Sequence, residues 1–599
     1  MEISKNYNFT KIICLLVVLI LQVKSNVISI SLNDIGTDVT NDNYKIESKV
    51  LSLTKSGTFK ISGSCNECQI AINKDLEITL TISSISIDNS NTGPFVIKKS
   101  STLNLILEGD STITDNESLD NEESDDFEGA GIKIKSSSSL TISGSGKLTV
   151  NGNPKNGIKG GASSKLTINS GTIVITATKN ALACDHLLTI NGGTITITSQ
   201  SDGVKAEPDS DDNDSEGTIE INGGVINVNS KNDAIQAGYK LIINGGTFNI
   251  KTFDGANTSG FDKDTMSAKG IKCSTNEHEN IDNIITITGG TFTLNTRDDA
   301  IHSDYNITIT GGTFDISTGD DGVHADHYLV LGKLNADNSL INMKIKQSYE
   351  GLEGANVYIY SGTYNIIASD DGINSAGDAT GNCANQGGGG QPIGPGGNPG
   401  GNPNDRPSNL RNLQPNLNQC LIFHIFIYGG EIYVNAGSDG LDANGDITIS
   451  GGNLEIWGMT SGGDGDPIDQ DGTLTITGGT ILAGGSQGME PIHRSSRTIS
   501  QNFIYSTDSY QANKELSIKD GDNTIRTFTT PKKINYLFYT SKDTTSNYKF
   551  SEGRSSTNSD ASKESQNPNP NPNQNSSNLP YIFGIISVIL VILALLLLL

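Results

Sequence analysis

The stretch "NITITGGTFDISTGDDGVHAD", Asn306–Asp326, contains three short segments in which apolar and polar residues alternate, separated by Gly, Asp and Thr. This alternation is typical of β-strands with one buried face. In "GTFDI" we expect Phe314 and Ile316 to point inward, and in "GVHAD" we expect Val323 to point inward and His324 outward. The stretch therefore predicts three strands per unit, each ending at a turn.

The same unit recurs along the chain with a spacing of about 22 residues between Gly-Gly pairs. That period is too short for stacked helix pairs and lacks a leucine-rich consensus. Three strands per period wind into a right-handed parallel β-helix, with coils about 4.8 Å apart. The predicted fold class is thus all-β, a right-handed parallel β-helix with a small C-terminal β cap. The repeats begin at Asn191, Asn222, Asn244, Gly289, Gly311, Gly429 and Gly451.

The predicted β-helix spans residues 26–490 and carries acidic loop insertions, together with a Gly/Pro/Asn-rich insertion at about 380–418 that is too polar to hold a core. Beyond it the period is lost. Residues 491–550 contain alternating segments that we expect to form a cap over the open end of the helix.

Both ends of the chain have the composition of targeting segments. Residues 1–25 predict a signal peptide, with lysines before an apolar run. Residues 551–580 are a Pro/Asn/Ser-rich stalk, and residues 581–599 are wholly apolar with no Lys or Arg after them. This ending favours a GPI-attachment signal, with a membrane anchor as the alternative. We expect passage through the secretory pathway to the extracellular face of the cell surface, with membrane anchoring.

Charge and cysteines narrow the partners and the compartment. A formal charge of −26 excludes nucleic acid, which needs a face rich in Lys and Arg. Cys65 and Cys68 could close a local disulfide, or form half of a zinc site. Cys184 and Cys273 lie about three coils apart, roughly 14 Å, and are expected to be buried thiols outside any disulfide.

Doubled aspartates fall at the same corner of different coils, with Glu350 on the coil between. Carboxylates stacked about 5 Å apart repel, so the folded stack needs raised pKa values or a cation. Calcium suits such a site, because it takes six to eight oxygen ligands at flexible angles. The alternative is that these aspartates only form turns. The candidate metal ligands are Asp298, Asp299, Asp320, Asp321, Asp370 and Asp371.

A second row of residues is predicted on the outward face, one position after the inward aliphatic residue of each unit. Its histidines, His302 and His324, could bind a metal or transfer a proton, or could simply be solvated. With Glu353 they are our candidate substrate-binding residues. The row comprises Lys159, Lys205, Gln236, Lys272, His302, His324, Glu353, Asn374 and Asp442.

The order "DDAIHSDYNITITGGTFDISTGDDGVHADHYLVL", "SYEGLEG", "SDDGINSAG", then "GSDGLDANGDITISGG" resembles a family of bacterial and protist carbohydrate-binding proteins, over about Ile46–Phe550. That family is a right-handed parallel β-helix related in architecture to calcium-dependent pectate lyases. The resemblance implies bound calcium at the six aspartates and binding of polygalacturonate, with cellulose as a further candidate. His302, His324 and Glu353 match motif positions that have no assigned role. The stalk and the apolar tail depart from the pattern.

Three functions follow from these features. The first is a surface protein that binds acidic polysaccharide through calcium. The second is a pectate-type lyase, in which Lys205 or Lys272 would remove the proton; no catalytic residue is assigned. The third is an adhesin or coat protein, for which N-glycosylation would be expected. The acceptor motifs lie at Asn116, Asn213, Asn257 and Asn306.

Overall fold

The computed structural model describes most of the chain between residues 27 and 552, and these residues belong to one compact unit. The predicted signal peptide, the insertion at about 380–418, the stalk beyond residue 552 and the apolar tail lie outside the described residues. No helix in the described ranges is long and apolar enough to span a bilayer. These ranges are 27–124, 127–207, 217–274, 284–376, 423–460, 466–488, 491–493 and 497–552.

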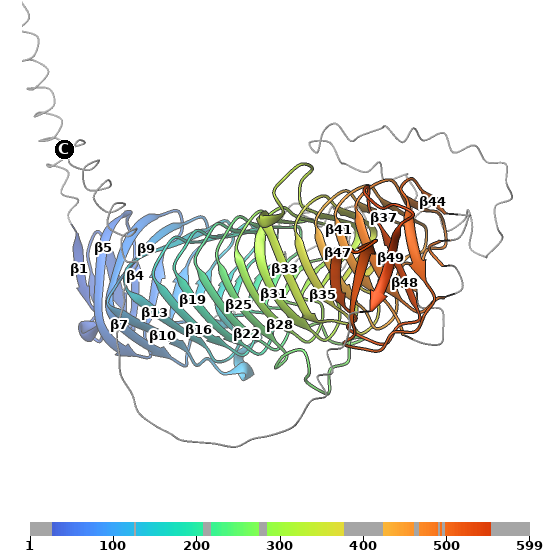
Figure 1. Cartoon of the computed structure of the whole chain (residues 1–599). Helices are drawn as coiled ribbons and strands as arrows, with labels where there is room; N and C mark the ends of the chain where they lie inside the picture. The colour runs from blue at the N-terminus through green and yellow to red at the C-terminus, as the bar shows by residue number, and fades with distance from the viewer. Residues whose placement is uncertain are drawn as a thin grey trace, which may run out of the picture. The chain divides into compact units, whose positions relative to one another are not determined.

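The chain is all-β, with a 46-stranded, mostly parallel sheet and a separate three-stranded sheet in its described part. In the middle of the chain each strand pairs in parallel with the third strand after it, which produces three stacks (Figure 1). Stack 1 holds the "GGTFDI" strands, stack 2 the "GVHA" strands and stack 3 the "NITI" strands. The all-β class and the parallel stacking are confirmed. The right-handed, closed coil of about 22 residues stays a prediction.

Stack 1 includes β16 (Thr172–Ala177), β19 (Thr194–Ser199), β22 (Val225–Ser230), β25 (Thr247–Thr252), β28 (Thr291–Thr296) and β31 (Gly312–Thr318). Stack 2 includes β11 (Ala130–Ile134), β14 (Asn156–Gly160), β17 (Leu182–Cys184), β20 (Val204–Ala206), β23 (Ile235–Ala237), β26 (Ile271–Cys273), β29 (Ile301–Ser303), β32 (Val323–Leu331), β34 (Leu352–Ile359), β36 (Ile373–Ser375) and β39 (Leu441–Ala443). Stack 3 includes β15 (Lys165–Ile168), β18 (Leu187–Ile190), β21 (Thr218–Ile221), β24 (Lys240–Ile243), β27 (Ile284–Ile287), β30 (Asn306–Ile309), the later halves of β32 and β34, and β37 (His424–Ile427).

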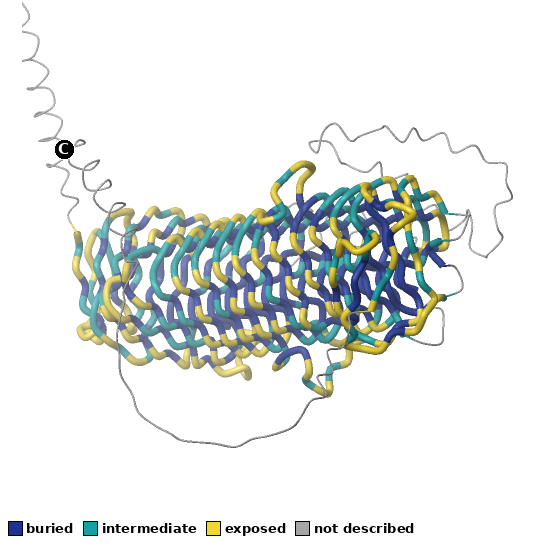
Figure 2. The backbone as a smooth tube through the Cα atoms, in the orientation of Figure 1, coloured by how far each residue is buried: buried dark blue, intermediate teal, exposed yellow. Residues whose placement is uncertain are grey.

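The core is a continuous column of inward aliphatic and aromatic side chains. Figure 2 shows buried backbone segments repeating along the stacked coils. Phe248, Phe292 and Phe314 occupy one register position on successive coils, with ring centroids 4.6 Å apart and nearly parallel planes. Val323 is fully buried, whereas His324 is only partly buried. The predicted inward and outward faces are therefore confirmed.

Glycine is required where stack 1 begins. Gly312 has a φ of 128°, which side chains rarely adopt, and a Cβ there would lie 2.9 Å from the ring of Phe314. Gly290 has the same conformation one coil earlier, with a φ of 119°. The Gly-Gly repeat thus marks the corner that brings each aromatic residue into the core.

Antiparallel strands follow the last parallel coils. β43 (Thr480–Gly485) and β45 (Phe503–Ser506) both pair antiparallel with β48 (Tyr536–Thr540). The three-stranded sheet contains β46 (Glu515–Asp520), β47 (Asn523–Thr529) and β49 (Tyr548–Glu552). This pairing covers the edge of β43, as a terminal strand requires.

The cysteines decide one pair of alternatives and confirm one prediction. Cys65 and Cys68 form a disulfide, so they are not half of a zinc site. Cys184 and Cys273 are buried thiols in the core of stack 2. A disulfide suits an oxidising compartment.

Asp115, at the end of β10 (Asp110–Asp115), is a fully buried carboxyl. Its Oδ1 accepts the N–H of Glu117, at 2.9 Å, whereas its Oδ2 has no hydrogen-bond partner among the described residues. Burial raises the pKa of Asp115 to about 7. The folded protein therefore holds a proton there that the unfolded chain releases near pH 4.

Removing one ring from the phenylalanine stack tests the core. Phe292→Ala should lower the free energy of unfolding by about 3–5 kcal/mol, because it leaves a cavity between two rings. Thr293→Ala, at the neighbouring exposed position, should change it by less than about 0.5 kcal/mol. Urea unfolding followed by circular dichroism measures both. Equal effects of the two substitutions would contradict the assigned faces.

Asp115→Asn keeps the hydrogen bond to Glu117 and removes the ionisable group. Because the folded pKa lies above the unfolded value, the free energy of unfolding of the wild type should fall as the pH rises from about 4 to about 7. The variant should lose the part of this decline that Asp115 contributes, and should be more stable than the wild type by about 4 kcal/mol at about pH 8, with little difference near pH 4. Urea midpoints across this pH range provide the measurement, and parallel pH profiles would disprove the account.

Candidate functional site

Stack 2 carries an outward row of polar side chains, which we name the central row. Its members pair coil by coil in the parallel ladder, so they lie directly above one another along the stack. The predicted row from Lys159 to Asp442 is confirmed, and the structure adds Lys133 before it and Ala183 within it. In order, the central row is Lys133, Lys159, Ala183, Lys205, Gln236, Lys272, His302, His324, Glu353, Asn374 and Asp442.

A second row, the corner row, lies three residues before the central row, where the chain turns into stack 2. Its carboxylates bridge the coils: the N–H of Asp321 donates to Asp299 Oδ1 at 3.1 Å, and the N–H of Glu350 donates to Asp321 Oδ1 at 2.9 Å. One oxygen of Asp299 and one of Asp321 thus form the turn, as the alternative interpretation expects. The corner row contains Asp202, Asp233, Lys269, Asp299, Asp321, Glu350, Asp371, Asp439 and Asp466.

Lys269 is the corner-row residue that the sequence interpretation missed. Its Nζ lies 2.8 Å from Asp298 Oδ1 and 2.7 Å from Asp299 Oδ2, all three side chains being largely buried. Burial alone would raise the pKa of Asp299, but Lys269 and His302 outweigh it and hold that pKa well below its usual range. The first aspartate pair therefore already has a cation supplied by the protein.

Asp320 also faces a lysine, because Lys263 Nζ lies 3.3 Å from its Oδ2. Burial and the nearby Asp299 nevertheless raise the pKa of Asp320. Asp298, Asp299 and Asp320 lie close enough to share an ion, but lysines compete for the same oxygens.

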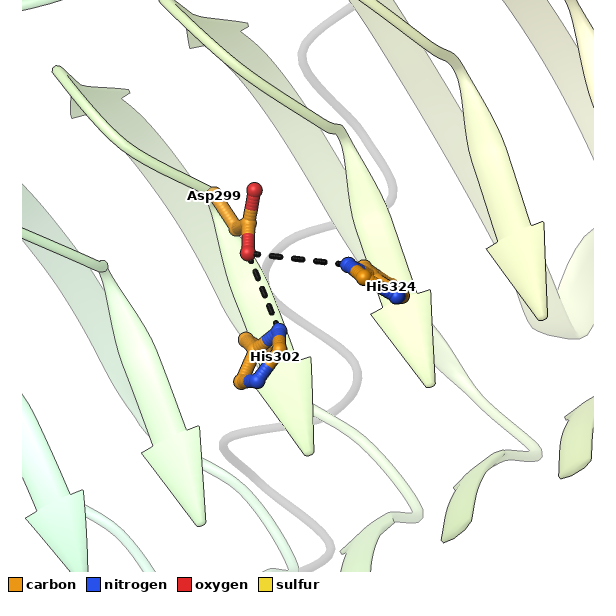
Figure 3. Close-up of side chains that lie close together, drawn as sticks. All are labelled: Asp299, His302 and His324. Atoms are coloured by element: carbon orange, nitrogen blue, oxygen red, sulfur yellow. Dashed lines mark ion pairs between the residues drawn. The ribbon is translucent and has the colours of Figure 1, made fainter. Parts of the chain in front are cut away.

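His302 and His324 lie on neighbouring strands, each beside Asp299 (Figure 3). The two histidines nevertheless differ in charge. Burial lowers the pKa of His302, but its ion pairs with Asp299 and Asp304, at 2.9 and 3.0 Å, raise it to about 9. Burial lowers the pKa of His324 to about 4. Asp299 lies farther from His324 than from His302, at 3.8 Å, and its charge does not offset the effect of burial. At neutral pH His302 is a cation held by carboxylates, and His324 is a neutral imidazole.

Neutral His324 lies between two further acids. Its Nδ1 is 3.6 Å from Asp321 Oδ2 and 3.4 Å from Glu353 Oε2. Burial, followed by neighbouring carboxylates, raises the pKa of both acids. One imidazole nitrogen and two carboxylates can ligate a divalent cation. The structure thus brings the predicted Asp321, His324 and Glu353 together.

Glu350, Asp370 and Asp371 form a cluster of oxygen ligands that has no lysine. Their carboxylate oxygens lie within 4.8 Å of one another. In the described part of the chain, no Lys or Arg forms an ion pair with them. Burial and the adjacent Glu353 raise the pKa of Glu350 to about 8. This acidic cluster favours either bound protons or a bound cation.

Asn374 completes the acidic cluster. Its Nδ2 donates to Glu350 Oε2 at 2.8 Å, and its Oδ1 is buried without a hydrogen-bond partner among the described residues. An amide oxygen left without a donor beside three carboxylates suits a hard cation, which binds oxygen. The donor set fits calcium better than a metal that prefers nitrogen or sulfur.

A second acidic group, Asp439, Asp442 and Asp469, follows on the next coils. Burial, followed by nearby carboxylates, raises the pKa of Asp439 to about 8 and that of Asp442 to about 7. Asp442 was visible in the sequence as a member of the predicted outward row. Asp469 was not, because the spacing to its coil departs from the repeat.

The two lysines considered as lyase bases are held in ion pairs. Lys205 Nζ lies 2.6 Å from Glu207, and Lys272 Nζ lies 3.3 Å from Asp233. Burial lowers the pKa of Lys205, but Asp202 and Glu207 raise it above its ordinary value. A protonated, paired lysine cannot accept a proton, so the geometry does not favour base catalysis.

Aromatic side chains, sparse in the sequence, gather on the outward face of stack 3. The rings of Tyr358 and Phe426 lie 4.7 Å apart and those of Tyr360 and Tyr428 4.9 Å apart, each pair nearly parallel. Each ring therefore packs against a ring one coil away. This ladder stabilises the stack, and it had no signal in the composition.

Residues 47–322 match the family model described as "carbohydrate-binding domain-containing protein". The match covers just under half of the chain, and this segment is similar to that family. A "carbohydrate-binding domain-containing protein" of Acetivibrio thermocellus is 31% identical over 162 residues, which cover 25% of this chain. The match spans about half of that relative, 56% of its length.

Among solved structures, the chain is similar to the gadolinium derivative of a polysaccharide lyase-like protein from C. thermocellum, with 30% identity and a TM-score of 0.33. That match covers 38% of this chain and 91% of the other. The carbohydrate-binding family segment includes Lys269, His302 and the first two aspartate pairs. Glu353 and the acidic cluster lie beyond it.

Lys269→Met tests whether the ammonium compensates the first aspartate pair. The substitution leaves Asp298 and Asp299 buried without their cation and should lower the free energy of unfolding by about 3 kcal/mol, measured with urea in EDTA. Adding Asp298→Asn and Asp299→Asn should restore part of the loss. Lys251→Met, at an exposed position, is the control and should have little effect. A Lys269→Met protein as stable as the wild type would refute the assignment.

Proposed function

We propose that this chain is a cell-surface carbohydrate-binding protein that binds acidic, polygalacturonate-like polysaccharide through calcium. The observation that carries the proposal is the acidic cluster of Glu350, Asp370 and Asp371, with the buried oxygen of Asn374 beside it. The family segment supports a carbohydrate ligand. A rigid stack of strands supports the site from below, so its carboxylates are held in place before the ligand arrives.

Calcium explains how a protein of net charge −26 could hold a polyanion. Calcium takes six to eight oxygens, and a cluster that supplies only some of them leaves positions for carboxylates of the sugar. Glu350, Asp370, Asp371 and Asn374 would hold the ion. Bound there, it would supply positive charge to an otherwise negative face.

Under this proposal, three of the six predicted aspartate ligands bind metal and the other three have a structural role. Asp370 and Asp371 belong to the acidic cluster, and Asp321 would serve a neighbouring position with His324 and Glu353. Asp298, Asp299 and Asp320 face Lys269 and Lys263, so we assign them to the structure of the corner. His302, a cation held by Asp299 and Asp304, would contribute charge to the face without ligating the metal.

We further propose that the three stacks close into a right-handed parallel β-helix presented outside the cell. The predicted signal peptide and apolar tail support this location, and the disulfide between Cys65 and Cys68 agrees with it. The stalk would hold the stack away from the membrane. A lipid anchor and a membrane-spanning tail both agree with this arrangement.

Calorimetric titration of the purified protein with calcium, and then with polygalacturonate, tests the function. Calcium should bind, and EDTA should weaken polygalacturonate binding at least about tenfold. Glu350→Gln combined with Asp371→Asn should weaken calcium binding by about the same factor, because two ligand charges are lost. Asp110→Asn, an exposed aspartate away from stack 2, is the matched control.

Absence of calcium binding, or equal binding by the double variant and the control, would refute the site. Ultraviolet absorbance of an unsaturated product would show lyase activity instead of binding alone. Calcium binding without any polysaccharide binding would favour the adhesin or coat function.

A further inference from the structure

A cavity of about 410 Å³ lies at the other end of the same face, on stack 2. It exists because Ala183 occupies the central row between Lys159 and Lys205, and its short side chain leaves space that a longer one would fill. The volume falls in the range of about 300–1,000 Å³ that is typical of small-ligand pockets. Along the ladder Ala183 is six coils from Glu353. We name this cavity the lysine pocket.

Five lysines line the lysine pocket, and three of them are neutralised by acids. Lys155 pairs with Glu122, while Lys159 and Lys205 have carboxylate partners at 2.6 Å. The side chains of the other two, Lys133 and Lys179, form no hydrogen bond or ion pair within the described ranges. Five acids line the pocket as well, Glu122, Glu128, Asp185, Asp202 and Glu207, so its formal charge is balanced. Lys133 and Lys179 are nevertheless the two ammonium groups without a direct carboxylate contact, which leaves their N–H groups available to an anionic ligand.

Lys133 and Lys179 differ in exposure. Lys133 is partly buried on β11, in the central row, whereas Lys179 is exposed at the rim. Burial lowers the pKa of Lys133, so its ammonium is stabilised by any anion that enters. An anion bound here can contact one ammonium inside the pocket and a second at its edge.

Phe127 supplies an apolar wall. Its ring lines the pocket and is partly buried, and Lys155 Nζ lies 5.6 Å from its centroid. No other aromatic ring stacks on it among the described residues, in contrast to the rings of stack 3. A partly exposed aromatic ring beside cations suits a ligand that has both C–H groups and a negative charge, as a uronate ring does.

We propose that the lysine pocket is a second carbohydrate subsite, in which Lys133 and Lys179 bind the carboxylate of one uronate residue directly and Phe127 packs against its ring. No metal takes part. The identity of the ligand rests on the proposed function, but the chemistry is independent of it. The acidic cluster would hold the polymer through calcium, and the lysine pocket would hold it through ammonium groups on the same face.

The experiment is a calorimetric titration of the full chain with trigalacturonate in EDTA, which removes the metal-dependent contribution. The wild type should bind trigalacturonate and should bind neutral cellotriose at least about tenfold more weakly. Lys133→Met combined with Lys179→Met should lower the affinity for trigalacturonate at least about tenfold. Lys147→Met, at an exposed position on a different strand, should leave it unchanged.

Ala183→Gln is a second variant that retains every lysine. It fills the cavity with the side chain that position 236 of the same row already carries, and it should also abolish binding of trigalacturonate. Circular dichroism and calcium titration of each variant establish that the fold and the acidic cluster are intact. Loss of binding with calcium affinity unchanged would confirm that the lysine pocket acts separately.

Three results would overturn the proposal: no binding of trigalacturonate in EDTA, equal affinities for trigalacturonate and cellotriose, or no effect of the lysine and Ala183 substitutions. Tighter binding of a sulfated disaccharide than of trigalacturonate would overturn the choice of carboxylate. If calcium-dependent binding of polygalacturonate survives any of these results, the proposed function stands. If calcium binding fails while trigalacturonate still binds in EDTA, only the lysine pocket stands.

Discussion

The polar face of this protein depends on the hydrogen bond between a corner carboxylate and the backbone N–H of the corner residue in the next coil. Asp299, Asp321 and Asp371 each form this bond, and each thereby fixes where the following coil begins. Parallel stacking then repeats the position about every 4.8 Å. Like charges are consequently brought together by the same contacts that build the fold, and each coil must balance that charge in its own way.

The coils achieve this balance by different means along the stack. Near β29, Lys269 and His302 neutralise buried aspartates. Toward β36 the lysines are absent, and the carboxyls of Glu350 and Asp371 have raised pKa values. The central row accordingly changes from lysine through histidine to acid. The two ends of one face differ in chemistry although their backbone is the same.

The sequence predicted the features that repeat. Period and alternation predicted the stacks, the inward phenylalanines and the central row, because these follow from strand geometry alone. Lys269 was missed because it stands in a row otherwise made of acids, after a long connection that hides its register with Asp299. Its significance depends on a contact between coils. The cavity at Ala183 was also missed, because a small residue in a row of longer ones forms no recognisable sequence motif.

Because a coil contains three strands that pair only with their neighbours, whole coils can be removed or added without altering the contacts inside the others. The number of coils between Ala183 and Glu353 therefore sets the distance between the two ends of the face, independently of the residues at either end. Loss or duplication of one coil would change the distance between the two ends of the face. The face would then match a polymer segment of a different length. Selectivity for chain length could then evolve through the number of repeats, with the binding residues unchanged.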